Sequence, residues 1–336
     1  MLVIPWDLAM TTAKRMAPLR QRYVSSQRHN DVASQLNMLL ANREMSLAPV
    51  KSDRKLGLLV VGATGAGKTT LLGQLQREHP YLVKRDERHL PLVSLRITAP
   101  VTNKSLAHQT LQALGFNSDF DPKISAHKYW GWVRAHAEAR NVFGFIFDEG
   151  QDLFLKASNA EAREALSMMK GLMEIPGHPY VLIMSGGPEL ERFIEMDPMV
   201  SERFYRAVLT PINPDRACKA LVPEMKIFAK QAGMEFGSDI EHIARRTIHA
   251  SFNQFGRSLE LTVDGIQEAA YAGAGKITMT MFADAYHRHT HCGPGQNIFL
   301  SDQWQSLSPI KITMDHVGAV AGKATTQVEK REDSIW

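Results

Sequence analysis

One glycine-rich segment has the residue types and the spacing of a phosphate-binding loop. Gly62, Gly67, Lys68 and Thr69 occupy the fixed positions of the pattern G-x-x-x-x-G-K-[ST], directly after the apolar run 56–61. Such a loop turns its backbone N–H groups toward a polyphosphate, while its lysine reaches the β- and γ-phosphates and its threonine hydroxyl binds Mg²⁺. We therefore predict a site for ATP or GTP; a glycine-rich turn that binds nothing is the alternative. The predicted nucleotide contacts are Gly62, Ala63, Thr64, Gly65, Ala66, Gly67, Lys68, Thr69 and Thr70.

A second apolar run ends in two neighbouring carboxylates. Residues 142–147 are followed directly by Asp148 and Glu149, and this pattern is typical of a buried strand that brings acidic groups to one edge of a sheet. We predict that Asp148 shares the Mg²⁺ ion with Thr69 and that Glu149 orients or deprotonates the attacking water. The alternative is a strand that merely ends in an acidic turn.

Three further residues are candidates for contact with the γ-phosphate. Ser185 ends the run 179–185, where P-loop ATPases with an extra strand before the acidic pair carry a sensing residue; a serine at a strand end is also common in turns. Arg203, with Arg206 as second choice, precedes a short apolar segment and could reach a neighbouring subunit's site, although both could be ordinary surface arginines. Arg257 opens a later helix and could reach back to the nucleotide.

These residues need a set of strands and helices to position them. Apolar runs predict strands at 56–61, 92–97, 142–147, 179–185 and 207–209. Helical spacing of apolar residues predicts helices at 31–42, 68–78, 105–114, 125–140 and 161–174. From residue 214 the same spacing predicts helices alone, at 214–232, 238–249, 256–272 and 279–290. An α/β domain followed by a small α-helical lid fits this order.

The first thirty residues have no regular apolar period, and Pro5 and Pro18 argue against one continuous helix. Between Leu8 and Asn30 there is no acidic residue. The basic residues of that stretch are Lys14, Arg15, Arg20, Arg22 and Arg28. They could contact DNA phosphates or an acidic protein surface, and a solvated tail explains them equally well.

Composition narrows the class of protein. The 336 residues can form one large domain or two smaller ones, and the net charge of +4 permits nucleic-acid binding without requiring it. Cys218 and Cys292 are the only cysteines, so we expect no disulfide framework and a reducing compartment. The sequence contains neither a signal peptide nor an apolar run long enough to span a bilayer, which predicts a cytoplasmic protein without a membrane partner.

Taken together, these features resemble an AAA+ ATPase, and more closely the TniB/TnsC family of transposition regulators, which is related to the replication initiators. The segments that carry the resemblance are 22–24, 31–42, 62–69, 147–151, 185–190 and 201–204. The resemblance covers about residues 20 to 290 and extends to 297–299, which read Asn-Ile-Phe where the family often has Asn-Pro-Phe. It implies an α/β fold, with a P-loop AAA+ domain built on a five-stranded parallel sheet plus a small α-helical lid. The implied division is a basic arm and helix at 1–50, the AAA+ domain at 51–213, the lid at 214–292 and a flexible, partner-docking tail at 293–336.

The resemblance also implies a mechanism. ATP- and Mg²⁺-bound subunits assemble around double-stranded DNA as a homo-oligomeric ring or helical filament, in which Arg203 completes the neighbour's site and ATP is hydrolysed slowly. The assembly marks the target, is recognised by a TniQ-type target-selection protein, and recruits and activates the transposase. The implied DNA contacts are Thr102 and Lys104, with Lys123 as a weaker candidate. A replication-type AAA+ loader or remodeller, and a scaffold that binds nucleotide only for stability, remain the alternatives.

Overall fold

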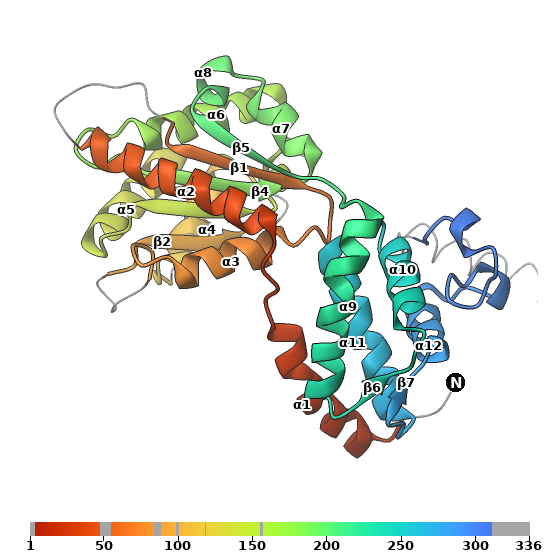
Figure 1. Cartoon of the computed structure of the whole chain (residues 1–336). Coiled ribbons are helices and arrows are strands. Elements are labelled where there is room, and N and C mark those ends of the chain that lie inside the picture. The colour runs from red at the N-terminus through yellow and green to blue at the C-terminus, as the bar shows by residue number, and fades with distance from the viewer. Residues whose placement is uncertain are drawn as a thin grey trace, which may run out of the picture. The chain divides into compact units, whose positions relative to one another are not determined.

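The computed structural model describes residues 4–47, 55–83, 89–98, 101–117, 119–154 and 157–310. The chain forms two compact units, both visible in Figure 1. The sheet unit comprises Tyr23–Thr210, and the helical unit comprises Met1–Arg22 together with Pro211–Trp336. The division into four segments predicted from the sequence stays a prediction.

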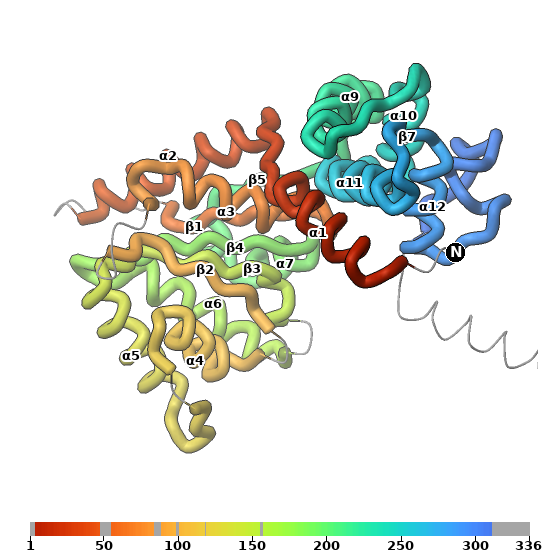
Figure 2. The backbone as a smooth tube through the Cα atoms, turned by 90° about the horizontal axis from the view of Figure 1, so that it is seen from below, coloured from red at the N-terminus to blue at the C-terminus, as the bar shows by residue number. Residues whose placement is uncertain are grey.

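The sheet unit is built on a five-stranded sheet in the order β2-β3-β4-β1-β5. Its strands are β1 (Gly57–Gly62), β2 (Leu92–Arg96), β3 (Gly144–Asp148), β4 (Val181–Gly186) and β5 (Phe204–Leu209). Every neighbouring pair is parallel, and Figure 2 shows β1, β4, β3 and β2 side by side. The predicted α/β fold class with a five-stranded parallel sheet is therefore confirmed. Since the strands are parallel, all their carboxyl ends lie along one edge, where ligands bind in open α/β sheets.

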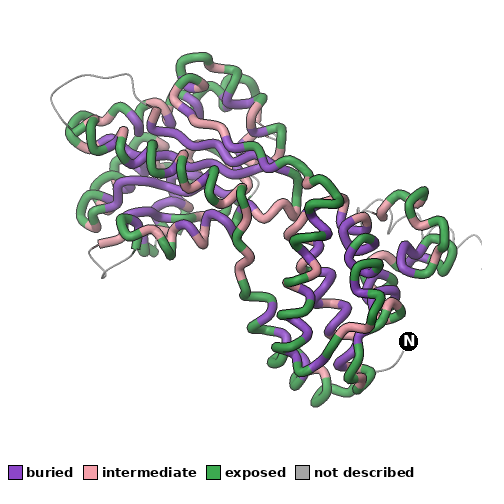
Figure 3. The backbone as a smooth tube through the Cα atoms, in the orientation of Figure 1, coloured by how far each residue is buried: buried purple, intermediate pink, exposed green. Residues whose placement is uncertain are grey.

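Helices cover both faces of this sheet. One face carries α2 (Gln27–Ser46) and α3 (Lys68–Glu78), while the other carries α4 (Asn103–Ala113), α5 (Ala126–Ala139), α6 (Asn159–Met173) and α7 (Pro188–Ile194). The two short helices η1 (Gly150–Leu153) and α8 (Pro198–Ser201) complete the unit. Alternate residues of β1 divide between the two faces: Leu58 and Val60 pack toward α2 and α3, and Leu59 and Val61 toward the opposite helices. The central strands β1, β3 and β4 are accordingly buried throughout, and Figure 3 shows the buried residues along the sheet, whereas the edge strands β2 and β5 include exposed residues.

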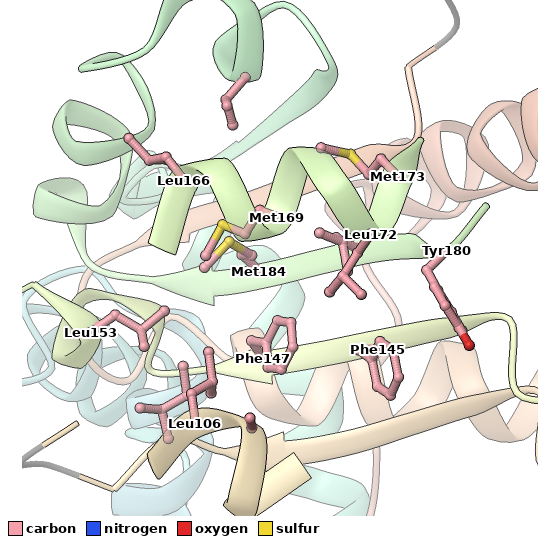
Figure 4. Packing of buried hydrophobic residues seen from close by; sticks show 14 of the residues in the cluster. Leu106, Phe145, Phe147, Leu153, Leu166, Met169, Leu172, Met173, Tyr180 and Met184 are labelled. Atoms are coloured by element: carbon pink, nitrogen blue, oxygen red, sulfur yellow. The ribbon is translucent and has the colours of Figure 1, made fainter. Parts of the chain in front are cut away.

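The larger core lies between the sheet and α6. Phe145 and Phe147 of β3 belong to the same buried cluster as Met169 and Leu172 of α6 and Met184 of β4, and Figure 4 shows them packed together. Each side chain of this size contributes about 1.5–3 kcal/mol when it is fully buried. This packing fixes the position of β3 and β4, and therefore of the polar residues at their carboxyl ends.

The helical unit contains α1 (Trp6–Gln21) and the helices predicted after residue 214. These are α9 (Pro214–Gln231), α10 (Ile240–Ala250), α11 (Phe255–Tyr271) and α12 (Met279–Thr290), followed by the short helices η2 (Pro294–Gln296) and η3 (Trp304–Ser306). A small parallel ladder, β6 (Glu235–Phe236) with β7 (Lys276–Ile277), was not predicted, because two residues are too few to show a strand pattern. Among the described residues, no helix is long and apolar enough to cross a membrane.

No single helix spans the first thirty residues, since α1 ends at Gln21 and α2 begins at Gln27, but Pro18 does not interrupt α1 as its position in the sequence suggests. Pro18 lies inside α1 and removes one backbone hydrogen bond. Met16 and Leu19 are nevertheless buried, and α1 packs along α11. This burial offsets the cost of the proline, so tertiary contacts rather than local propensity hold the helix.

Arg20, in the last turn of α1, and Arg22, directly after α1, have acidic partners inside the helical unit. Arg20 lies 2.7 Å from Oδ1 of Asp264, and Arg22 lies 3.2 Å from Oε2 of Glu224. An acidic surface for these arginines therefore exists within the chain itself. They are less available to an external partner than the sequence alone suggests.

Residues 297–299 are packed into the helical unit, which contradicts the flexible tail predicted from residue 293. Ile298 and Phe299 are buried, and the side-chain amide of Asn297 donates a 2.9 Å hydrogen bond to the carbonyl of Ala283. A buried apolar pair, next to a buried amide that donates to a carbonyl inside α12, gives this segment a fixed place. The rest of the predicted tail, 311–336, lies outside the described residues.

Candidate nucleotide site

The predicted phosphate loop lies at the carboxyl end of β1 and leads directly into α3, as the sequence predicts. Gly67 has a φ of 89°, in the left-handed region that favours glycine, and it precedes the first helical residue, Lys68. No side chain caps the start of α3. Its first backbone N–H groups therefore remain available to an anion, which the helix dipole also favours.

Lys68 is buried at the centre of this loop. Its ammonium group donates to the carbonyl oxygens of Gly62 at 2.7 Å and Ala63 at 3.1 Å. Burial lowers the pKa of Lys68, while the nearby carboxylates of Glu149 and Asp148 act in the opposite direction. The hydrogen-bond partners of this buried cation are two neutral carbonyl oxygens, and a phosphate would supply a charged partner in their place.

Polar groups from α3, β3 and β4 meet at Asp148. The Thr69 hydroxyl donates a 2.6 Å hydrogen bond to Asp148 Oδ2, and the Ser185 hydroxyl donates to Oδ1. Strand register explains the meeting, because Phe147 pairs with Met184 and so places the next residue of β3 beside Ser185. The structure thus brings together Lys68, Thr69, Asp148 and Ser185, whose roles remain predictions. Thr69 and Asp148 supply hard oxygen atoms of the kind that Mg²⁺ prefers.

Glu149 follows at the turn between β3 and η1. Its φ of 57° is in the left-handed region, which costs a non-glycine residue about 1–2 kcal/mol. The side-chain amide of Gln151 donates to Glu149 Oε2 at 2.6 Å, and Arg96, at the end of β2, lies 3.8 Å from Oε1. Sequence reasoning missed both contacts. The available signals were the position of Gln151 two residues after Glu149 and of Arg96 at a strand end.

Arg203 lies at the amino ends of the parallel strands, whereas the phosphate loop lies at their carboxyl ends. Arg203 directly precedes β5, which runs parallel to β1, and its carbonyl accepts a 2.9 Å hydrogen bond from Gly57 N–H at the start of β1. The six residues of β1 span about 20 Å, so this arginine is remote from the loop of its own subunit. Its guanidinium pairs with Glu174.

Arg206, the second candidate, lies within β5 rather than before it, which corrects the predicted start of that strand. It pairs with Glu191 at 3.3 Å. The strand begins earlier than its apolar pattern indicates because pairing with β1 extends it back to Phe204.

The remaining predicted residues have partners of their own. Arg257, in α11 of the helical unit, lies over the ring of Phe252 at 5.7 Å. Thr102 caps α4 by accepting from Ser105 N–H at 3.1 Å, and Lys104 donates to the Pro122 carbonyl at 2.9 Å. The backbone N–H of Lys123 donates to Asp121 Oδ1 at 2.8 Å. The predicted roles of Arg257, Thr102, Lys104 and Lys123 stay predictions.

Comparison with known proteins gives three results. The family model of the bacterial TniB protein matches residues 15–213. No curated protein gives a significant match. Among solved structures, the ORC1 protein of Aeropyrum pernix in complex with DNA is similar over 93% of this chain and 86% of its own, with 13% identity and a TM-score of 0.57. Cdc6p from Pyrobaculum aerophilum is similar over 82% of this chain and 70% of its own, with 14% identity and a TM-score of 0.56.

At this level of identity the structural likeness establishes the fold alone, and that fold is the one expected of P-loop AAA+ ATPases. The family model also establishes the family, because its match at residues 15–213 spans over half of the chain. This protein therefore belongs to the bacterial TniB family.

Proposed function

We propose that this protein is a Mg²⁺-dependent ATPase that acts as a DNA-bound, oligomeric regulator of transposition. One observation carries the ATPase part of the proposal. The Thr69 hydroxyl and the Asp148 carboxylate lie 2.6 Å apart at the mouth of the phosphate loop, beside the buried Lys68. Two oxygen ligands and a buried cation at the start of a helix suit a magnesium–polyphosphate ligand.

Each group then has a defined task. Lys68 and the first turn of α3 bind the phosphates of ATP, and Thr69 and Asp148 hold Mg²⁺. When bound, Mg²⁺ neutralises the charge of the phosphates. Glu149 orients the attacking water and accepts its proton, and Ser185 keeps the Asp148 carboxylate in place through its hydrogen bond.

The far position of Arg203 supports an oligomer. An arginine at the sheet edge opposite its own loop can stabilise the transferred phosphoryl group only in a neighbouring subunit. A ring or helical filament supplies such a neighbour at every site. In the proposed assembly, Arg257 contacts the γ-phosphate, and Thr102, Lys104 and Lys123 contact the DNA backbone.

Membership of the TniB family supports the link to transposition. On that basis we propose a transposase and a TniQ-type target-selection protein as partners. A cytoplasmic site of action fits the two free, buried cysteines, Cys218 and Cys292.

Electron microscopy of the purified protein with duplex DNA tests the proposal, with a non-hydrolysable ATP analogue compared against ADP. Rings or filaments on DNA with the analogue alone are the expected result, together with Mg²⁺-dependent release of phosphate from ATP. Monomers under both nucleotide conditions would contradict a DNA-bound assembly and favour a loader or a scaffold.

A further inference from the structure

The side chain of Gln151 joins Glu149 to the turn that follows β4. Its Nε2 donates to Glu149 Oε2 at 2.6 Å, and its Oε1 accepts from the backbone N–H of Gly187 at 3.0 Å. One carboxamide therefore connects the end of β3 with the start of α7. No other part of the proposed mechanism uses this residue.

Chemistry fixes the orientation of this amide. A carboxylate only accepts hydrogen bonds and a backbone N–H only donates them, so Nε2 must face Glu149 and Oε1 must face Gly187. The flipped amide would place oxygen against oxygen and N–H against N–H. Both ends of the Gln151 amide are thus specific for their partners.

Gly186 leaves the space that this arrangement needs. A Cβ atom at Gly186 would lie 2.3 Å from Gln151 Oε1 and 3.0 Å from Leu190 Cδ2. A contact of 2.3 Å is far below van der Waals separation, so any side chain at position 186 would push the amide aside. The contact of Gln151 with Glu149 therefore requires that position 186 has no side chain.

The Gln151 contact is the closer of the two that hold the Glu149 carboxylate. Arg96 lies 3.8 Å from the other oxygen, Oε1, and its side chain is 75% exposed. An exposed ion pair at that distance contributes little. A short hydrogen bond to a charged group within the fold contributes more and has a defined direction.

We propose that Gln151 is a positioning residue that aims the Glu149 carboxylate for ATP hydrolysis. It couples that carboxylate to the turn at Gly186 and Gly187, directly after Ser185, so that the acidic end of β3 and the polar end of β4 hold one fixed geometry. The left-handed backbone of Glu149 fixes the side chain at its base, and Gln151 fixes it at its tip. This inference rests on the ATPase function proposed above.

Four variants test it: Gln151→Ala, Gln151→Glu, Gly186→Ala and, as matched control, Gln76→Ala. Gln76 has the same side chain and donates to the backbone carbonyl of Leu92 at 3.0 Å, at the amino end of β2 and away from Glu149. For each protein, kcat and KM for ATP, equilibrium affinity for a non-hydrolysable ATP analogue, and Tm are measured. Misplacement of a catalytic group by about 1 Å costs on the order of 100-fold. We expect Gln151→Ala and Gly186→Ala to lower kcat by about 10- to 100-fold, with analogue affinity within about threefold of wild type.

The relative kcat of Gln151→Ala and Gln151→Glu distinguishes a positioning role for Gln151 from a role that only fills space. Glutamate keeps the size of Gln151 and its acceptor for Gly187, but it sets a second carboxylate against Glu149. Positioning therefore predicts a kcat for Gln151→Glu at or below that of Gln151→Ala, whereas a structural filler predicts the reverse. The double variant Gly186→Ala, Gln151→Ala should be no slower than either single variant, because both remove the same contact.

Two results would overturn the inference. One is a kcat within about twofold of wild type for both Gln151→Ala and Gly186→Ala, because a misplacement of about 1 Å should cost far more than that. The other is a higher kcat for Gln151→Glu than for Gln151→Ala. A wild-type protein that binds no ATP analogue, or that turns over no ATP with and without DNA, would reject the ATPase function itself. That failure is visible in the wild-type measurement alone, before any variant is compared.

Discussion

The hydroxyl of Thr69 lies 2.6 Å from Asp148 Oδ2, although 79 positions separate the two residues in the chain. One residue belongs to the first turn of α3 and the other ends β3. They meet because both strands that deliver them are parallel members of one sheet and end at the same edge.

Replacing Lys68 by alanine should weaken the binding of Mg²⁺-ATP. The substitution removes a buried ammonium group beside the loop, and we expect a loss of about 100-fold in affinity, equivalent to about 2.7 kcal/mol. Isothermal titration calorimetry with a non-hydrolysable analogue measures it. Lys55→Ala is the control, because Lys55 also donates to a backbone carbonyl, that of Phe204 at 3.2 Å. An affinity unchanged by Lys68→Ala would exclude phosphate contact.

Replacing Glu149 by glutamine should stop turnover while leaving ATP-dependent assembly on DNA intact. Glutamine keeps the size of the side chain but cannot accept a proton, and loss of a general base costs about 10²- to 10⁴-fold in rate. Phosphate release measures the first effect and electron microscopy the second. If turnover survives, Glu149 is not the catalytic base.

Arg203→Ala should abolish turnover in assembled protein without weakening ATP binding by isolated subunits. An arginine supplied to a neighbour's site raises kcat by about 10³- to 10⁵-fold. Mixing Arg203→Ala subunits with Glu149→Gln subunits should restore part of the activity, because each Glu149→Gln subunit still offers its Arg203.

The control for this mixture uses a partner that carries both Glu149→Gln and Arg203→Ala and therefore supplies no arginine. If ATPase activity recovers with this double-variant partner, Arg203 is not the arginine supplied to the neighbouring site. The same conclusion follows if the mixture with the single variant Glu149→Gln assembles but recovers no ATPase activity. The same pair of mixtures made with Arg206→Ala tests the second candidate.

Lys104→Ala should weaken binding to duplex DNA uniformly across sequences. A lysine that contacts one phosphate contributes about 0.9 to the slope of log affinity against log salt. Affinity measured by fluorescence anisotropy over a range of salt concentrations gives this slope. Lys276→Ala is the control, since Lys276 lies 3.8 Å from Glu235 in the small ladder of the helical unit. An unchanged slope for Lys104→Ala would remove Lys104 from the DNA contacts.

The contact between His289 and Asp264 should make stability depend on pH. The hydrogen bond to Asp264, 2.8 Å long, raises the pKa of His289 above its ordinary value of 6.5, against the effect of partial burial. A raised pKa in the folded state means stabilisation that is full below the unfolded pKa and is lost as pH rises through the folded one. His289→Gln should therefore lower Tm more at about pH 6 than at about pH 9.

The same substitution made in Asp264→Asn protein provides the control. Without the carboxylate, the loss of His289 should change Tm by a similar amount at both pH values. A pH-independent effect in otherwise wild-type protein would show that the Asp264 contact does not stabilise protonated His289.

The sequence alone predicted the elements around the nucleotide site well. The phosphate loop, the helix from Lys68 and the strand ending at Asp148 are local features, since glycine spacing and uninterrupted apolar runs follow directly from neighbouring residues. The same holds for the four helices after residue 214, whose apolar spacing is strong. Trp130, in the helix predicted at 125–140, is buried in the core.

Features held by distant contacts could not be predicted in this way. Helix α1 contains Pro18 and has a weak apolar period, and its burial against α11 stabilises it. Strand β5 begins before its apolar segment because β1 pairs with it. The segment around Ile298 belongs to the tail that the sequence predicts to be flexible, yet Ile298 is buried in the helical unit.

What the sequence by itself determined is which residues could bind a nucleotide, because the chemistry of the phosphate loop depends on residue type at short spacing. Only the tertiary structure decided what holds Glu149: its contact with Gln151 depends on the turn at Gly187 and on the space at Gly186, which belong to another strand. It also placed Arg203 at the far edge of the sheet. Strand order and register set both arrangements, and residues brought together across a sheet leave no short-range pattern in the chain.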